Sequence, residues 1–341
     1  MGIDVHKKSW MVAVCSENVS YRPFGQAADA ALLLAFLHDN FPGGEYHSAY
    51  EAGFSGFWLH RILADNGVDS IVIHPGDIPT TDRESEFKTD SRDARKIAEA
   101  LRSGQLTGIH VPGRQREEER SLIRLRKQLR KDLVRQKCRI RMMLAYYGIR
   151  FPEQWDRSRW DRGLRKWLWE LELQHPEGTD TLRLMMGQFE YLRGIRNHVK
   201  GRMLDLSNKD GYLEDASLLE SVPGFSRRTA VRFLAELGDI RRFGTLDRLC
   251  SYIGLVPATH SSGESHRAGR LTYRGHTELR MMMVEAAWVA TGVDPALAVA
   301  YQHFKKRMIP QKAIIKIARK LLARARYVLL HREPYVMGTA S

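Results

Sequence analysis

The fold of the N-terminal region is decided by the stretch KTDSRDARKIAE, Lys88 to Glu99. Asp90 and Asp93 open a segment whose next turns are basic and apolar. Their three-residue spacing places both on one face of a helix, at its positively polarised N-terminal end. Two interpretations are open: the acidic first turn that commonly begins a helix, or half of a metal site. The choice depends on whether other carboxylates reach the same place.

Predicted strands and helices alternate along the region before this stretch. Helical periodicity predicts helices over 27–40 and from 54 to about 66. Apolar and β-branched runs predict strands at 1–5, 7–16, 19–24, 46–51 and 69–74, the third closed by Pro23. The resulting order is that of the RNase H fold, an α/β domain whose sheet begins as an antiparallel meander and continues as βαβ units. The first strand is short, so two expectations are open: a start slightly upstream of Met1, or a truncated first strand.

Four carboxylates occupy equivalent places in this order. Asp4 ends the first strand, Glu51 ends the fourth, and Asp90 with Asp93 opens the last helix. Ligands commonly gather beyond strand ends in such sheets. Ionised acids packed together repel each other unless a cation is present, and oxygen ligands suit Mg²⁺ or Mn²⁺. Each acid alone is ordinary turn chemistry, but the set of four in this order favours a site for metal-dependent phosphodiester chemistry.

Bulk properties point to a polyanionic partner. The chain has 341 residues, enough for two or three domains, and 54 Lys and Arg against 40 Asp and Glu give a net charge of +14. Basic residues are spread over several segments, which favours nucleic acid over an anionic membrane surface. The cysteines Cys15, Cys138 and Cys250 are far apart, which argues against zinc or disulfides and fits a reducing cytoplasm. No signal peptide and no membrane span are expected.

The middle of the chain predicts a helical arm. A long helix over 113–147 has a leucine stripe that includes Leu122, Leu125 and Leu129, and basic residues on its other faces. Those faces are either a solvated coiled-coil surface or a phosphate-tracking surface, and the second is preferred. A shorter helix with Trp160, Trp167 and Trp169 and another helix over 178–208 follow, so two long antiparallel helices are expected. The tryptophans are expected in the core rather than as a stacking platform.

The C-terminal region holds two further candidate features. LLESVPGFSRRTAVRFLAEL, from Leu218, resembles a helix-hairpin-helix with Arg227 and Arg228 beside a phosphate-binding turn, although a plain helix-helix turn is equally open. A polar loop, LVPATHSSGESHRAGRLTYRGHTELR, then carries Ser261 and Ser262 before Gly263. A serine held among arginines could attack phosphorus, although Ser-Ser-Gly alone is common turn chemistry. Helices are expected at 279–291, 295–307 and 310–331.

The motifs GIDVHKK, YEAG, KTDSRDARKIAE, ESVPGF, SYIGLVPATHSSGESHRAGRLTYRGHTELR and PQKAIIKIARKLLA together resemble the DEDD transposases of the IS110 insertion-sequence family. The resemblance spans nearly the whole chain and is weakest in the helical middle. It implies a RuvC-like nuclease domain over 1–112, a coiled-coil region over 113–212 and a C-terminal transposase domain over 213–341. It also implies Asp4, Glu51, Asp90 and Asp93 as metal ligands and Ser262 as the nucleophile, with Ser261 as the fallback.

The resemblance also implies partners. Donor and target DNA, a structured noncoding guide RNA, and homodimers that assemble into a tetramer are expected, with the serine of one subunit completing the carboxylate site of another. Action in the cytoplasm, at the nucleoid, follows. The basic side chains expected to contact nucleic acid are Lys88, Arg92, Arg124, Lys127, Arg130, Lys131, Arg227, Arg228, Arg267, Arg270 and Arg274.

Three functions are compared on these grounds. The favoured one is a Mg²⁺-dependent, RNA-guided DNA recombinase with a serine nucleophile. The second is a RuvC-like nuclease that cleaves DNA junctions by attack of water. The third is a non-catalytic nucleic-acid-binding protein, against which the four intact acids argue.

Overall fold

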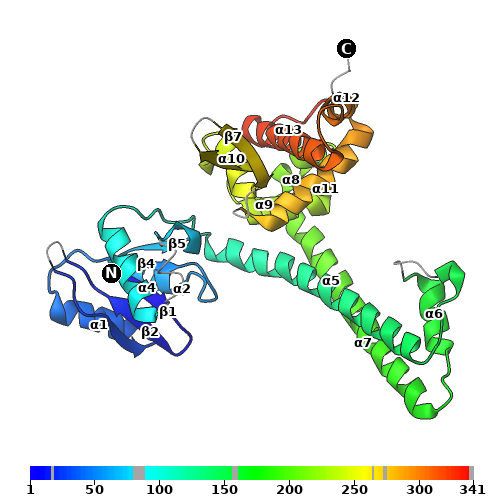
Figure 1. Ribbon diagram of the computed structural model, residues 1–341, viewed down its shortest axis with the longest axis horizontal. Coiled ribbons are helices and arrows are strands. Elements are labelled where there is room, and N and C mark those ends of the chain that lie inside the picture. Colours follow the sequence, from blue (N-terminus) through cyan, green and yellow to red (C-terminus); the bar gives the residue numbers. More distant parts are fainter. Residues whose placement is uncertain (17–18, 80–88, 156–159, 263–264, 272–274, 338–341) are drawn as a thin grey trace. The chain divides into compact units, whose positions relative to one another are not determined.

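The computed structural model describes residues 1–16, 19–79, 89–155, 160–262, 265–271 and 275–337. The chain forms two compact units, Met1–Pro112 and Gly113–Ser341, each with its own buried core (Figure 1). The expected helical middle and the expected C-terminal domain both lie in the second unit.

The first unit is built on one mixed sheet. Its strands are β1 Gly2–Val5, β2 Ser9–Ala13, β3 Phe24–Ala27, β4 His47–Glu51 and β5 Asp69–Ile73. Their order in the sheet is β3-β2-β1-β4-β5. β1 pairs antiparallel with β2 and parallel with β4, β2 pairs antiparallel with β3, and β4 pairs parallel with β5. The expected RNase H-like fold class is thereby confirmed.

One strand was predicted in the wrong place. The third strand does not cover 19–24; it begins at Phe24 and runs to Ala27. Pro23 has no N–H to donate to a ladder, so it precedes the strand instead of closing it. The preceding segment forms a bridge between Cys15 and Ser20 and a hydrogen bond from the Tyr21 N–H to the Val14 carbonyl, and the Tyr21 ring packs edge-on against Phe41.

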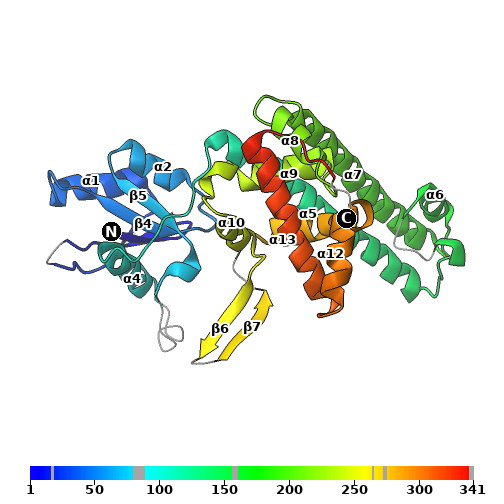
Figure 2. The ribbon, with the colours of Figure 1, turned by 90° about the horizontal axis from the view of Figure 1, so that it is seen from above.

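Helices cover the two faces of this sheet (Figure 2). Alternation along β1 and β4 turns Ile3 and Tyr50 towards α1 (Ala30–Asn40) and α2 (Trp58–Asp65), with which they share a core. The opposite face carries Ala49, which packs with Ile97 of α4 (Asp90–Arg102). A short 3-10 turn, η1 (Pro75–Asp77), follows β5.

The backbone of α4 lies against β1 with no room for a side chain between them. A Cβ atom added at Gly2 would lie 2.2 Å from the Ala94 carbonyl oxygen and 2.4 Å from the Ala98 nitrogen. Only glycine permits so close an approach. The contact fixes the position of α4, and with it the first turn that carries Asp90 and Asp93, relative to the strand that ends near Asp4.

Two long helices dominate the second unit. α5 (Arg114–Tyr146) packs along α7 (Pro176–Ser207), with η2 (Glu153–Trp155) and α6 (Arg162–Glu170) between them in sequence (Figure 1). Trp160 is buried in the core between α5, α6 and α7, as expected, and Trp167 packs against that core, but Trp169 is exposed. Leu125, predicted on the apolar stripe, is instead exposed. Arg120, predicted on a basic outer face, is buried because its guanidinium finds carbonyl partners at the end of another helix.

Further helices complete the second unit around one large core. The segment predicted as a polar loop is a β-hairpin, β6 (Pro257–Ser262) paired with β7 (Ser265–Leu271). Its residues lack apolar alternation, so backbone pairing forms the strands without a sequence signal. The helices are α8 Leu213–Glu220, α9 Arg227–Leu237, η3 Ile240–Arg242, α10 Leu246–Ile253, α11 Thr277–Val293, α12 Pro295–Lys305 and α13 Pro310–His331.

In the part of the chain that the structure describes, not one helix is both long and apolar enough to cross a bilayer. α11 and α12 meet the length and composition requirement only when taken together, and they are bent by 108°.

Candidate metal centre and nucleophile

The four predicted acids lie at one edge of the first unit. Gly2 pairs with Ala49 and Ile3 with Tyr50, so the next position of this parallel register sets Glu51 beside Asp4. Both side chains belong to the sheet face that α4 covers, because they follow Gly2 and Ala49 by two residues. Asp90 and Asp93 lie in the first turn of α4, after the N-cap Thr89. Strand ends and helix start therefore meet at this edge.

Two of these acids are joined by a residue that the sequence analysis missed. His6 Nε2 lies 3.2 Å from Asp4 Oδ2 and 3.4 Å from Asp90 Oδ2. Its sequence signal was present in GIDVHKK, because a residue two positions after Asp4 in extended chain emerges on the same side. One ligand atom from each of Asp4, His6 and Asp90 lies within 4.8 Å of the others, close enough to share one ion.

Burial and neighbouring carboxylates both disfavour the charged form of Asp4. Burial raises the pKa of Asp4, the nearby Asp90 and Asp93 raise it further, and His6 opposes the rise. The structure thus relates Asp93 to Asp4 through charge and Glu51 to Asp4 through strand register. A divalent cation would remove this repulsion, and carboxylate oxygens with one imidazole are a suitable donor set for it.

The predicted nucleophile lies on the hairpin of the second unit. Ser262 is the last residue of β6 and is paired with Ser265, and Ser261 precedes it opposite His266. Arg267 and Arg270 lie on β7, the strand that returns from the turn. Of the other predicted residues, Gly263, Arg274 and Lys88 lie outside the described residues.

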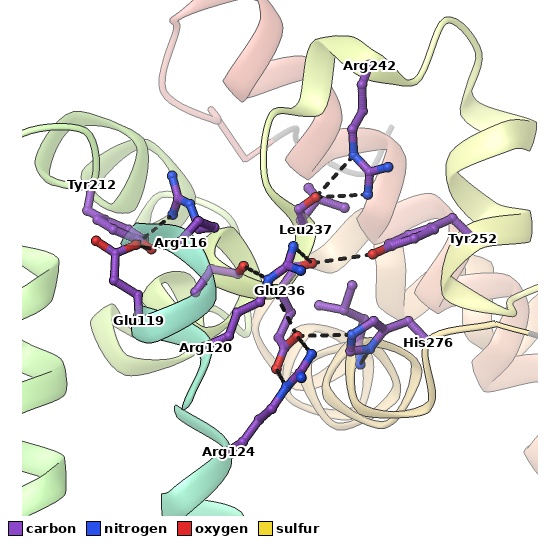
Figure 3. A network of polar contacts seen from close by, with 12 residues as sticks. Arg116, Glu119, Arg120, Arg124, Tyr212, Glu236, Leu237, Arg242, Tyr252 and His276 are labelled. Atoms are coloured by element: carbon purple, nitrogen blue, oxygen red, sulfur yellow. Dashed lines mark hydrogen bonds and ion pairs between the residues drawn. The ribbon is translucent and has the colours of Figure 1, made fainter. Parts of the chain in front are cut away.

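A buried polar network holds the segment that follows the hairpin (Figure 3). His276 donates its backbone N–H to the Tyr252 carbonyl at 2.8 Å and accepts the Leu279 N–H on Nδ1, which caps α11. Nε2 therefore carries the proton and lies 3.2 Å from Glu236 Oε2. Gly275, with φ 118°, packs against Gly254 too closely to admit a Cβ. The chain after β7 is thus tied to α9 and α10.

Two arginines of α5 complete this network at the end of α9. Arg124 binds both Glu236 carboxylate oxygens, at 3.0 and 2.9 Å, and Arg120 donates to the Ala235 and Glu236 carbonyls at 2.8 and 3.1 Å (Figure 3). Burial opposes ionisation of Glu236, but hydrogen bonds from His276 and Arg124 outweigh it and lower its pKa to about 2. The network is therefore an ionised one that links the arm to the residues after the hairpin.

Several cations predicted to bind nucleic acid have partners within the protein. Arg124 pairs with Glu236, Lys127 with Glu278 at 2.5 Å, and Arg227 with Glu220 at 3.0 Å and Ser217 at 2.7 Å. Arg92 on α4 and Arg228 at the start of α9 are exposed. Some of the predicted cations thus stabilise the fold and others face solvent, and composition alone does not distinguish the two groups.

A basic groove of about 500 Å³ lies between α5, α9 and α11. Arg130 and Lys131, both predicted to contact nucleic acid, line it together with Arg126 and Arg232. Burial lowers the pKa of Arg126, and so do the surrounding cations Arg232, Arg130, Arg196 and Arg228. Mutual repulsion of this kind favours a bound polyanion. The predicted nucleic-acid contacts did not include Arg126, Arg196 or Arg232, because these residues come together from three different helices, α5, α7 and α9.

Comparisons with known proteins agree with this arrangement. Residues 1–149 match a transposase family model of the DEDD type, and residues 216–302 match the transposase IS116/IS110/IS902 family. A putative transposase of Sinorhizobium fredii is 28% identical over 292 residues, 84% of this chain and 70% of its own.

Two other relatives broaden the comparison. The transposase for insertion sequence element IS1533 of Leptospira borgpetersenii is 28% identical, over 71% of this chain and 70% of its own. A pilin gene-inverting protein of Moraxella bovis is 35% identical over 127 residues, 35% of this chain and 38% of its own. A DEDD domain implies the use of divalent metal, and a transposase binds DNA. The chain therefore belongs to the IS110 family of transposases, with a DEDD domain at its N-terminus and the family's second transposase domain in its C-terminal region.

Proposed function

We propose that this transposase cuts and rejoins DNA through a transient link to Ser262, at a carboxylate site formed by Asp4, Glu51, Asp90 and Asp93. The observation that carries the proposal is the meeting of β1, β4 and the first turn of α4 at one edge, where burial and the nearby Asp90 and Asp93 raise the pKa of Asp4. Acids arranged this way are of little use to the fold, but they suit the binding of divalent cations.

The four carboxylates would hold Mg²⁺ or Mn²⁺. When bound, these ions supply charge neutralisation for the scissile phosphate and lower the pKa of a coordinated hydroxyl. Asp4 is fixed by β1 and Asp90 by α4, and the Gly2 contact holds the two elements in register. The chain therefore presents its oxygens from rigid elements, as a phosphoryl-transfer site requires.

The proposed covalent step is a transesterification. The Ser262 hydroxyl loses its proton to a base, a bond forms between Oγ and phosphorus, and the bond from phosphorus to the leaving strand's oxygen breaks. That oxygen takes up a proton. Attack of a strand hydroxyl on the phosphoserine reverses these changes. The phosphoserine link conserves the energy of the phosphodiester bond, so no cofactor is consumed. Arg267 and Arg270 of β7 are proposed to hold the phosphate charge.

DNA and a structured guide RNA are the proposed ligands of the basic surfaces. The groove lined by Arg126, Arg130 and Arg232 supports this, because its cations repel one another in the free protein. A homodimer that assembles into a tetramer is proposed as well. Exposed apolar pairs with helical spacing support self-association of the arm, Met142 with Tyr146 on α5 and Leu184 with Tyr191 on α7.

A second candidate function is hydrolysis of DNA junctions by water, as in RuvC-like nucleases. One observation favours it: among the described residues, Asp4, His6 and Asp90 form a ligand group that lies wholly within the first unit. In that reaction Ser262 has no covalent role.

A trapped adduct separates the two candidates. DNA carrying a phosphorothiolate at the cleavage point is incubated with Mg²⁺, the noncoding RNA of the element, and either wild type, Ser262→Ala, Ser261→Ala or Asp90→Asn. Wild type and Ser261→Ala are expected to give the protein-DNA adduct, while Ser262→Ala and Asp90→Asn give none. Strand cleavage by Ser262→Ala at the wild-type rate would refute the serine mechanism and leave hydrolysis. Equal yields with and without RNA would refute guidance.

A further inference from the structure

We propose that His6 is a nitrogen ligand of the metal centre, so that the site selects Mn²⁺ over Mg²⁺. The inference rests on the proposed carboxylate site and adds a residue outside its four acids. It begins from the position of the ring, which lies between the oxygens of Asp4 and Asp90.

The distances fit one shared ion. Two donor atoms that each lie about 2.1 Å from an ion, at right angles, are about 3 Å apart. His6 Nε2 lies 3.2 Å from Asp4 Oδ2 and 3.4 Å from Asp90 Oδ2, so modest closure around an ion satisfies this geometry. An ion placed among these three atoms would be bound by two oxygens and one imidazole nitrogen.

The backbone holds His6 in this place. Its N–H donates to the Ser9 carbonyl at 3.2 Å, where the β1–β2 connection begins. Asp4 and His6 therefore come from one short segment, and Asp90 comes from the helix that lies against it. The ring is half-exposed, which leaves room for water or phosphate oxygen on the open side of an ion.

Donor chemistry sets the expected selectivity. Mg²⁺ prefers oxygen ligands alone, whereas Mn²⁺ accepts imidazole more readily and stands below the later transition metals in nitrogen affinity. Replacing His6 by an amide removes the nitrogen and keeps a polar side chain. Mn²⁺ affinity should then fall by about tenfold or more, while Mg²⁺ affinity changes by less.

Pulsed EPR of the Mn²⁺-loaded full-length protein tests the inference directly. Wild type should show coupling of the manganese electron spin to an imidazole nitrogen, and His6→Gln should bind Mn²⁺ without it. His47→Gln is the matched control. His47 also pairs with an aspartate, at 3.0 Å from Asp69 Oδ2, and is similarly exposed, but it lies at the other end of β4. The His47→Gln variant should keep both the nitrogen coupling and the Mn²⁺ affinity of wild type.

The outcomes distinguish this inference from the proposed function. Persistence of the nitrogen coupling in His6→Gln, or its absence from wild type that binds Mn²⁺, would show that His6 is only a neighbour of the site. Asp4→Asn tests the carboxylate site itself and should abolish tight Mn²⁺ binding. Unchanged binding in Asp4→Asn would overturn the site as a whole, whatever His6 does.

Discussion

The contact between Gly2 and α4 gives a prediction whose size can be worked out from the structure. In Gly2→Ala the new Cβ would lie 2.2 Å from the Ala94 oxygen, where 3.0 Å is the practical lower limit, so α4 must move away by about 0.8 Å. Overpacking of this kind costs about 1–3 kcal/mol, and the opposing atoms here are backbone, which places the cost near the upper end. A loss of about 3 kcal/mol lowers the Tm of a unit this size by roughly 10 °C or more.

The same displacement moves Asp90 away from Asp4, because Asp90 is the first residue of α4. A misplacement near 1 Å in a reacting site costs about 100-fold in rate. We therefore expect Gly2→Ala to lose Mn²⁺ affinity and strand cleavage by more than its stability loss explains, measured well below the new Tm.

Gly25→Ala is the matched control for this prediction. Its Cβ would meet only the Met11 Cε atom, at an ordinary 3.7 Å, in the same sheet but on the edge strand β3. Its Tm should equal that of wild type or rise slightly, since alanine restricts the unfolded chain. If calorimetry and Mn²⁺ titration give the same values for Gly2→Ala as for Gly25→Ala, the close approach of β1 and α4 is not what aligns the acids.

Three further substitutions test the second unit. Glu236→Gln should lower the free energy of unfolding by about 3 kcal/mol at pH 7, because the folded pKa of Glu236, about 2, lies below its ordinary 4.5. The difference in stability from wild type should shrink as the pH falls from about 5 towards 2, because the stability that ionised Glu236 contributes is lost in that window. Urea unfolding at several pH values measures this difference. A difference that stays constant with pH would contradict an ionised network. Gly224→Ala should lower the free energy of unfolding by about 3 kcal/mol or more, because its φ is 89° and the new Cβ would lie 2.2 Å from the Ala286 oxygen. Gly211→Ala is the control, because its φ of 83° is similar but its Cβ would enter open space. Thermal unfolding should show a loss of only about 1–2 kcal/mol for it. Arg130→Gln should weaken nucleic-acid binding and reduce the slope of log K against log salt by about 0.7–0.9, measured by fluorescence anisotropy. Arg241→Gln is the control, because the Arg241 guanidinium is paired with Asp239 away from the groove. It should leave the slope unchanged.

Features decided by neighbours in sequence could be predicted. The apolar runs of β1, β4 and β5 and the amphipathic pattern of α4 each form a local signal, and their order leaves few topologies. The acids followed from that order, because the ends of parallel strands meet at one edge.

Features decided by distant contacts could not be predicted. The β6–β7 hairpin has few apolar residues in its sequence, so its strands depend on backbone pairing. His6 became a candidate ligand only when α4 brought Asp90 to it. Arg120 carries no sequence mark that distinguishes it from a solvent-facing arginine, and its burial follows from the carbonyls of Ala235 and Glu236.

The arginines of α5 show why charge counts need a structure. Arg124 and Arg130 are six residues apart on one helix. Arg124 forms an ion pair with the buried Glu236, whereas Arg130 lines a groove in which the basic residues outnumber Glu278 and Glu285. Removing Arg124 leaves a buried carboxylate with one fewer partner and is a folding defect, which costs several kcal/mol when a buried pair is broken. Removing Arg130 relieves repulsion between cations in the free protein. The substitution should therefore lower the affinity for nucleic acid and leave the free energy of unfolding undiminished. The two substitutions therefore have different effects on stability. That difference, more than the net charge of +14, identifies which cations bind nucleic acid.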